Sequence, residues 1–101
     1  MQRLVRGLDG FMARMAYQMY GSAEKKTAAE LLFEAKRFHK NATVNIALDS
    51  SVNDLSARTG LARETVSRQV GSLLQKELIA KSGNRITIVD LAELEDYVIS
   101  E

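Results

Sequence analysis

The chain has 101 residues, 46% of them hydrophobic and 27% charged, with a formal net charge of +1 at pH 7, which fits one folded domain with at most one appended element. It has no cysteine and one histidine, His39, which excludes disulfides, cysteine nucleophiles and cysteine- or histidine-cluster metal sites. No stretch approaches the roughly 20 apolar residues of a membrane span, and Arg3, Arg6 and Asp9 interrupt any signal-peptide core, so we expect a cytoplasmic location.

The beginning of the chain predicts an amphipathic helix. Its apolar side chains recur every three or four residues, which is the a/d pattern of a coiled coil. We predict that this helix forms a dimer interface through Val5, Leu8, Phe11, Met12, Met15 and Met19. The alternative is a stripe that packs on its own domain, but its position before a Gly21-Ser22 break favours the dimer. We accordingly divide the chain into a dimerisation helix at 1–21 and a second domain at 22–101.

A second helix is predicted with Ser22 as its N-cap and its end near His39. Its last turn carries basic side chains, the sign that the helix dipole favours there. The apolar positions expected to face the core are Ala28, Leu31, Leu32, Ala35 and Phe38. After this helix, the alternation of Val44, Ile46 and Leu48 with Asn45 and Ala47 predicts a short strand.

Two short helices separated by a glycine turn are predicted next. Ser51 and Asp54 have the spacing of a capping box at the start of the first helix. Gly60 can adopt the positive φ of the turn that ends it. The second helix is expected over about residues 62–76.

Two strands and a last helix complete the predicted elements. The strands, residues 78–81 and 85–89, are joined by Gly and Asn in a hairpin, and Asp90 can cap the last helix, whose apolar positions are Leu91, Leu94 and Val98. Two helices joined by a glycine turn and followed by a hairpin are typical of a winged helix-turn-helix. The predicted fold is therefore mainly α with a small antiparallel β wing, preceded by a long N-terminal amphipathic helix.

The second of the two short helices has the chemistry to read DNA bases. Its apolar side chains fall on one face, at Val66, Val70, Leu73 and Leu74. On the opposite face, an arginine can donate two parallel hydrogen bonds to guanine, and a glutamate can accept one from cytosine. The predicted base-reading residues are Arg63, Glu64 and Arg68. The alternative for Glu64 and Arg68 is a solvated ion pair one helical turn apart.

Other polar side chains are predicted to hold DNA phosphates, contacts that position a protein without specifying sequence. They are Ser51, Thr65, Ser67, Lys81, Ser82, Asn84 and Arg85. The alternative for the hairpin residues is an ordinary solvated turn. Charge patterning favours a basic surface, because residues 50–85 carry six basic and three acidic side chains, whereas residues 90–101 carry five acids and no base.

The run from Asp54 to Arg68 (DLSARTGLARETVSR) resembles the helix-turn-helix of the Crp/Fnr (catabolite activator) family of transcription regulators. Its most specific part is the RETVSR segment from Arg63 to Arg68, and a looser likeness covers nearly the whole chain. The resemblance implies a homodimer whose recognition helices enter successive major grooves of a near-palindromic DNA site. It also implies that Arg63, Glu64 and Arg68 read bases, with Arg63 pointing to the catabolite-activator branch and to TGTGA-like half-sites.

Two positions depart from the family pattern. Ala62 stands where the family often has serine or threonine, which removes one cap and one phosphate contact, and Gln69 stands at a usually apolar position. The family's effector-binding β-barrel is also absent from the sequence, which suggests a C-terminal winged helix-turn-helix domain with part of the dimerisation helix. We therefore expect no cofactor in this chain. The resemblance suggests a cyclic nucleotide as the effector class of the missing sensor, and RNA polymerase as a further partner.

The leading hypothesis is sequence-specific binding of double-stranded DNA by a dimeric transcription regulator. The recognition helix at about 62–76 would lie in the major groove, and the wing at about 78–89 would lie on the DNA backbone. The alternative is a winged-helix module for protein–protein interaction without specific DNA binding. An enzyme is the least favoured class, because the sequence offers no nucleophile–base arrangement, phosphate-binding loop or metal cluster.

Overall fold

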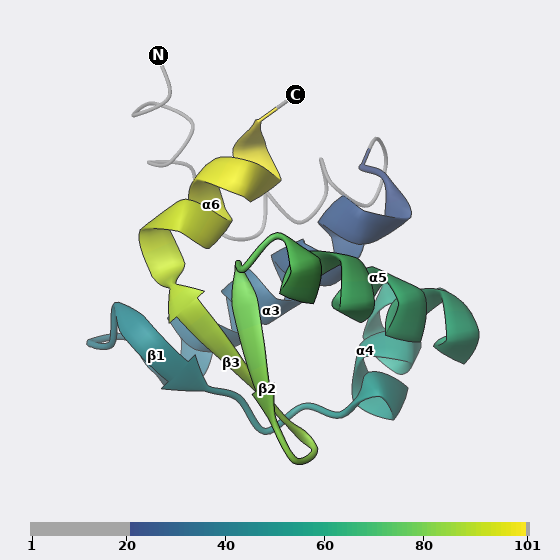
Figure 1. Ribbon diagram of the computed structural model, residues 1–101, viewed down its shortest axis with the longest axis horizontal. Helices are drawn as coiled ribbons and strands as arrows, with labels where there is room; N and C mark the ends of the chain where they lie inside the picture. Colours follow the sequence, from purple (N-terminus) through teal and green to yellow (C-terminus); the bar gives the residue numbers. More distant parts are fainter. Residues whose placement is uncertain (1–20, 101) are drawn as a thin grey trace.

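The structure is a computed structural model that describes residues 21–100. Four helices and three strands occur within this range: α3 (Ala23–Phe38), β1 (Val44–Ala47), α4 (Val52–Thr59), α5 (Arg63–Gln75), β2 (Ile79–Ser82), β3 (Arg85–Asp90) and α6 (Leu91–Ile99) (Figure 1). The strands form one antiparallel sheet in the order β1-β3-β2. This architecture confirms the predicted winged helix-turn-helix. The predicted dimer interface, at Val5, Leu8, Phe11, Met12, Met15 and Met19, lies outside the described residues.

Local capping residues determine where the helices begin and end. The Ser22 hydroxyl accepts a hydrogen bond from the Lys25 amide at the start of α3, and the Asp90 carboxylate accepts from two amides at the start of α6. Ser51 and Asp54 form the complete capping box of α4. Each side chain satisfies amides that the first helical turn would otherwise leave unpaired. The predicted starts of these three helices are confirmed.

The hairpin strands place alternate side chains in the core. Ile86 and Ile88 of β3 are 1% and 0% exposed, and Ile88 pairs with Ile79 of β2 on one side and Ile46 of β1 on the other. β1 is less regular than predicted, because Val44 is exposed and Asn45 has a positive φ of 50°. The chain beyond β1 stays attached to the sheet through a hydrogen bond from the Leu48 amide to the Ile86 carbonyl, 2.8 Å long.

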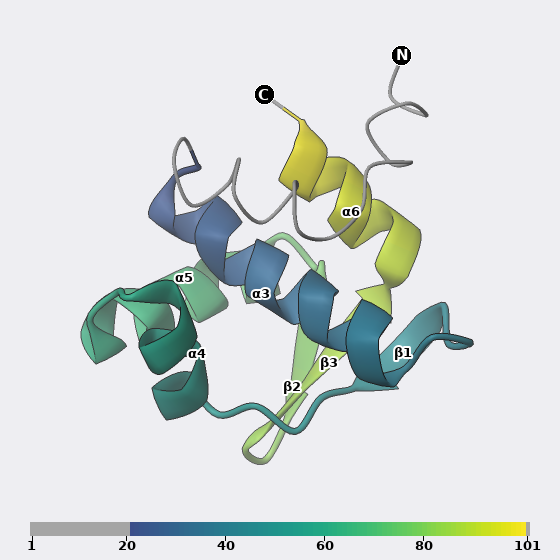
Figure 2. The same cartoon turned by 180° about the vertical axis from the view of Figure 1, so that it is seen from behind.

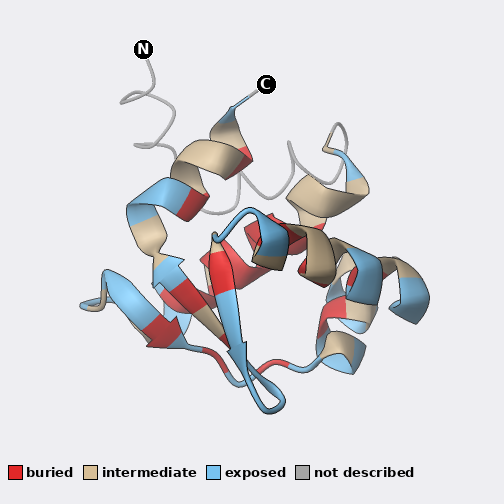
Figure 3. Cartoon of the chain, viewed as in Figure 1, coloured by how far each residue is buried: buried red, intermediate tan, exposed pale blue. Residues whose placement is uncertain are grey.

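Helix α3 is the centre of the packing. It contacts α4, α5 and α6. It crosses the face of the molecule that is turned toward the viewer in Figure 2. Buried residues gather along α3, the inner sides of α4, α5 and α6, and the sheet (Figure 3). The fully buried large side chains include Leu31, Leu48, Leu55, Val66, Leu73, Ile86, Ile88, Leu94 and Val98. One continuous core therefore holds both helices of the helix-turn-helix and the hairpin.

The predicted core face of α3 is wrong at its last position. Ala28, Leu31, Leu32 and Ala35 are buried as expected, but Phe38 is 67% exposed. Phe38 is the last residue of the helix, at the end that lies beyond the core, and its ring lies under the Arg37 guanidinium at 5.5 Å. Helical spacing gives the direction of a side chain but does not say where its packing partners end.

Among residues 21–100, no helix is both long enough and apolar enough to cross a membrane. The same range contains no group of three or more His, Cys, Asp or Glu side chains that could hold a metal ion.

Candidate nucleic-acid interface

Helix α5 buries one face and exposes the other, as the sequence predicts. Its buried side chains are Val66, Val70 and Leu73, whereas Leu74 is half-buried. Arg63, Glu64, Ser67 and Arg68 are all exposed. Burial of the apolar stripe against the core therefore turns the polar face outward, where a partner can reach it.

The turn between α4 and α5 is held by hydrogen bonds that fix the two helices relative to each other. Gly60 has a φ of 77° and donates its amide to the Ser56 carbonyl at 3.0 Å. The Ser56 hydroxyl donates to the Leu61 carbonyl at 2.6 Å, and the Thr59 hydroxyl accepts from the Leu61 amide at 3.2 Å. These bonds occupy the polar groups of a tight turn that only a glycine enters without strain.

The start of α5 is open to an anion. Ala62 occupies the N-cap position and makes no side-chain capping hydrogen bond. The first amides of a helix lack partners inside the helix, and they carry the positive end of its dipole. The departure from the family pattern at Ala62 thus removes a cap and leaves these amides for an external acceptor such as a phosphate.

A cleft of about 510 Å³ lies between the first turn of α4, the start of α5 and the hairpin. The residues that line it are Ser51, Val52, Asn53, Arg63, Glu64, Ser67, Lys81, Asn84 and Ile86. Six of them are residues that the sequence predicts to contact DNA: Ser51, Arg63, Glu64, Ser67, Lys81 and Asn84. The fold therefore brings together side chains from three elements that are separated along the chain.

The other predicted site residues lie outside the lining of this cleft. Arg68 is exposed on the next turn of α5, and Thr65 is half-buried near its start. Ser82 and Arg85 are exposed where β2 and β3 meet. The hairpin tip that carries them projects away from α6 (Figure 1).

The predicted base-reading side chains are not held by neighbours. Within residues 21–100, Arg63, Glu64 and Arg68 form no hydrogen bond or ion pair with one another or with other residues. The alternative of a Glu64–Arg68 ion pair is therefore not realised. All three side chains present their hydrogen-bonding groups to solvent.

Two of the predicted phosphate-binding side chains are already engaged. Both the amide and the hydroxyl of Ser51 donate to the Asp54 carboxylate, at 2.9 and 3.0 Å. The hydrogen bond from the Ser51 amide holds the pKa of Asp54 below its usual range, and the hydrogen bond from the Ser51 hydroxyl adds a smaller effect in the same direction. On the hairpin, the Arg85 guanidinium pairs with the Asp49 carboxylate at 2.6 Å, and both side chains are largely exposed. A phosphate would have to compete with a carboxylate at both places.

The basic surface is smaller than the count along the sequence suggests. Of the six basic side chains in residues 50–85, Arg58 and Lys76 form ion pairs with glutamates of α3. Neither of these two lines the cleft. The exposed basic side chains of α5 and the hairpin are Arg63, Arg68, Lys81 and Arg85.

Asn53 is a cleft residue that the sequence analysis missed. It is exposed and lies in the first turn of α4, two residues after the N-cap Ser51. Its place beside the predicted phosphate contact Ser51 is shared by its neighbours Val52 and Asp54 and does not single it out. Without the hairpin in place, the sequence gives no reason to select Asn53 from its neighbours.

Comparison with known proteins identifies the family. A model of the Crp-like helix-turn-helix domain matches residues 25–97. The structure is similar to a CRP-family transcriptional regulator from Thermus thermophilus, with 26% sequence identity, a TM-score of 0.70, and coverage of 98% of this chain and 51% of that one. A CRP/FNR-family transcriptional regulator from the same organism gives 24% identity, a TM-score of 0.71, and coverage of 98% and 52%.

The fold is also similar to that of the CO-sensing protein from R. rubrum, with 20% identity, a TM-score of 0.62, and coverage of 85% of this chain and 40% of that one. The chain thus spans about half the length of the solved structures it matches, or less. No curated protein sequence matches it significantly.

Proposed function

The chain belongs to the family of Crp-like helix-turn-helix domains, and from this premise we propose that it binds double-stranded DNA sequence-specifically as part of a transcription regulator. The observation that carries the proposal is the cleft in which α5, the start of α4 and the hairpin present Arg63, Lys81 and four further predicted contact residues. The family and the two Thermus proteins are transcription regulators rather than enzymes.

In the proposed complex, α5 lies in the major groove and its exposed face reads base edges. Arg63 and Glu64 lie in its first turn, where they line the cleft, and Arg68 follows on the next turn. A helix rises about 1.5 Å per residue, so Arg63 and Arg68 are offset by about 7.5 Å along α5. This offset matches roughly two base-pair steps, which lets the two arginines address different base pairs while Glu64 accepts from a cytosine.

The remaining cleft residues would hold the DNA backbone. Lys81 and Asn84 on the hairpin face Ser51 and Asn53 on α4 across the cleft. These donors, together with Ser67 and the open amides at the start of α5, suit phosphate oxygens that flank a groove. Thr65, Ser82 and Arg85 would add contacts just outside the cleft.

Dimerisation is part of the proposal. Two copies joined through residues 1–21 would place their recognition helices in successive major grooves, roughly 34 Å apart, on a near-palindromic site. The interface would use the apolar stripe that contains Leu8, Met12 and Met15. Residues 22–101 would then form the DNA-binding domain of a cytoplasmic regulator that contacts RNA polymerase.

Substitution of Arg63 tests the base-reading role. A preferred duplex is selected from a random pool with the parent protein, and the affinities of the Arg63→Ala variant for it and for a scrambled duplex are measured. We expect a loss of about 1–3 kcal/mol on the preferred duplex, with relaxed discrimination at one base pair. The matched control is Arg37→Ala, which removes the same charge at the exposed end of α3.

The control should change the affinity for both duplexes by the same small factor. The proposal that Arg63 reads a base would be wrong if the Arg63→Ala variant bound both duplexes as tightly as the parent does.

A further inference from the structure

The segment from Asp49 to Ser51, which connects β1 to α4, lies between two hollows and contributes residues to both. On one side is the DNA cleft, which Ser51 helps to line. On the other side is a second hollow of about 450 Å³, lined by Glu34, Phe38, His39, Asp49, Ser50, Asp54, Ala57 and Arg58. Asp49 and Ser51 are exposed, and the one buried side chain of the segment, Ser50, is polar. The position of the segment depends on polar contacts.

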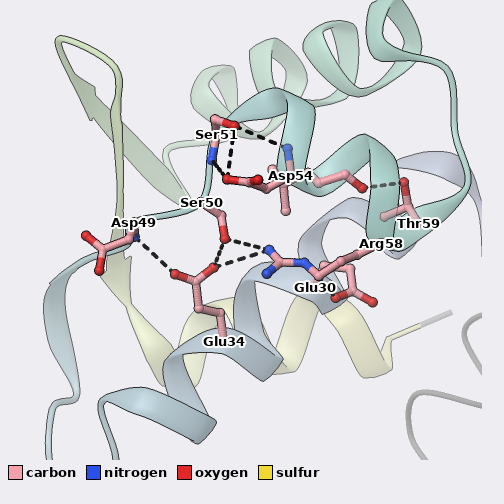
Figure 4. A network of polar contacts seen from close by, with 9 residues as sticks. Glu30, Glu34, Asp49, Ser50, Ser51, Asp54, Arg58 and Thr59 are labelled. Carbon is pink, nitrogen blue, oxygen red and sulfur yellow. Dashed lines mark hydrogen bonds and ion pairs between the residues drawn. The ribbon is translucent and has the colours of Figure 1, made fainter.

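Those contacts converge on one buried carboxylate of α3. Glu34, which is 8% exposed, accepts a hydrogen bond from the Asp49 amide at 3.0 Å and a short one from the Ser50 hydroxyl. The Ser50 hydroxyl also accepts from the Arg58 guanidinium at 2.6 Å. Figure 4 shows these side chains turned toward one another between α3 and α4.

Arg58 closes the network from the side of α4. Its guanidinium lies 3.3 Å from the Glu34 carboxylate and 3.6 Å from the carboxylate of Glu30. α3 therefore holds both the segment before α4 and the last turn of α4 itself. The three consecutive residues Asp49, Ser50 and Ser51 bind, respectively, the hairpin arginine, the buried network and the cap of α4.

Stability alone gives little physical reason for such a network. The free energy needed to remove two charges from water is about as large as the free energy gained from their attraction. Well-packed apolar side chains of similar volume often stabilise a fold as well or better. What apolar side chains cannot do is hold the Asp49 amide and the Ser50 hydroxyl at fixed points. Hydrogen bonds have defined lengths and directions, so they can fix a segment whose one buried side chain, Ser50, is polar.

We propose that Glu34 and Arg58 are positioning residues of the cleft: by holding Asp49 and Ser50, they fix the first turn of α4 and, through the adjoining hydrogen bond from Leu48 to Ile86, the attachment of this segment to the hairpin. The expected effect of Glu34 and Arg58 on DNA binding rests on the proposed function. Their effect on the structure of the cleft does not, because it can be measured in the free protein. Neither residue touches DNA in this arrangement.

The test replaces Glu34 in the full chain. Glu34→Leu removes both hydrogen bonds to the segment but leaves Arg58 facing Glu30, so no buried charge loses every partner. Glu34→Gln keeps an oxygen that can accept from the Asp49 amide. The matched control is Glu95→Leu, the same change in charge and chemistry at a glutamate of α6 that pairs with Lys36 of α3, away from the cleft residues.

The first readout is hydrogen exchange in the free protein. The probes are the amides of Asp54 and Leu55, which bond to the Ser51 hydroxyl and carbonyl, and of Leu48, which bonds to the Ile86 carbonyl of the hairpin strand. We expect exchange at these amides to be about tenfold faster in Glu34→Leu. It should stay near the parent rate in Glu34→Gln and in Glu95→Leu.

The second readout is DNA binding at several salt concentrations. Glu34→Leu should bind about tenfold more weakly than Glu95→Leu, whereas the slope of log affinity against log salt should change little, because the displaced cleft residues Ser51 and Asn53 are uncharged. If Glu34→Leu fails to fold, Ser50→Ala removes the bridging hydroxyl alone and should move both readouts in the same direction by less.

Exchange rates in Glu34→Leu equal to those of the parent and the control would overturn the proposal, whatever the DNA result. Equal rates in Glu34→Gln and Glu34→Leu would overturn it as well, because charge rather than hydrogen bonding would be the cause. A parent that bound no DNA, together with faster exchange in Glu34→Leu, would support the positioning of α4 and reject the proposed function instead.

Discussion

Replacement of Glu24 by glutamine tests how the C-terminal end of α5 is attached to α3. The Glu24 carboxylate accepts hydrogen bonds from the Lys76 ammonium at 2.8 Å and from the Ser72 hydroxyl at 2.5 Å, both at the C-terminal end of α5. Tyr97 of α6 also helps to lower the pKa of this carboxylate. The ammonium groups of Lys25 and Lys76 lie 5.0 and 5.2 Å from the Tyr97 ring centre. One carboxylate therefore joins three helices.

The size of the effect follows from the pKa of Glu24. Burial alone would raise this pKa, but the hydrogen bonds from Lys76, Ser72 and Tyr97 outweigh burial and lower it from 4.5 to about 2. One pKa unit is worth about 1.4 kcal/mol, which sets an upper bound of about 3 kcal/mol. Solvent screening of the exposed Lys76 reduces this bound, so we expect Glu24→Gln to cost about 1–2 kcal/mol at pH 7.

Thermal unfolding followed by circular dichroism measures this loss. For a domain of this size, about 1 kcal/mol lowers the melting temperature by roughly 4–8 °C. Because folding lowers the pKa of Glu24, its stabilisation is fully present above pH 4.5 and disappears as the pH falls from 4.5 through about 2. The difference in melting temperature between parent and variant should therefore be largest at neutral pH and should shrink toward pH 2.

The control is Glu93→Gln, which removes an exposed carboxylate of α6 and should lower the melting temperature much less. The reasoning would be refuted if Glu24→Gln and the parent melted at the same temperature at pH 7. It would also be refuted if their difference stayed constant between pH 5 and pH 2, because the cost would then not come from the ionised carboxylate.

Three further substitutions test the cleft and its frame. Lys81→Gln should weaken binding to preferred and scrambled duplexes alike and reduce the salt slope by about 1; an effect confined to the preferred duplex would contradict a phosphate role. Asp49→Asn should strengthen DNA binding, because it releases Arg85 from its carboxylate partner and removes a negative charge near the hairpin. Weaker binding of the variant in filter or fluorescence titrations would contradict this prediction and show that the pair serves mainly to hold the hairpin. Gly60→Ala should destabilise the fold by about 1–2 kcal/mol in urea unfolding, because alanine is strained at a φ of 77°; an unchanged urea midpoint would contradict this explanation of the turn.

The sequence predicted most reliably those features that depend on neighbouring residues. The caps at Ser22, Ser51 and Asp90 and the turn at Gly60 are built from groups only a few residues apart, so short patterns contain the whole interaction. The exposed and buried faces of α5 follow from helical spacing in the same way. These local signals were sufficient to predict the fold class and six of the residues that meet in the cleft.

The errors and omissions concern contacts between distant parts of the chain. Lys76 pairs with a residue 52 positions away and Arg58 with one 24 positions away. No local pattern indicates that these two basic side chains point to α3 rather than to a partner. Phe38 was misplaced because spacing alone does not show where the core ends. Asn53 was missed because only the folded hairpin makes the first turn of α4 one wall of a cleft.

Sequence-specific DNA binding is tested by a titration of the chain with two duplexes at several salt concentrations. One duplex carries two TGTGA-like half-sites whose centres are about one helical turn apart, and the other has the same bases in scrambled order. We expect tighter binding to the palindrome, by about 10³-fold or more, and a steep fall in affinity as salt rises. Equal weak binding to both would contradict base reading by Arg63, Glu64 and Arg68, and no binding to either at low salt would favour a protein-interaction module.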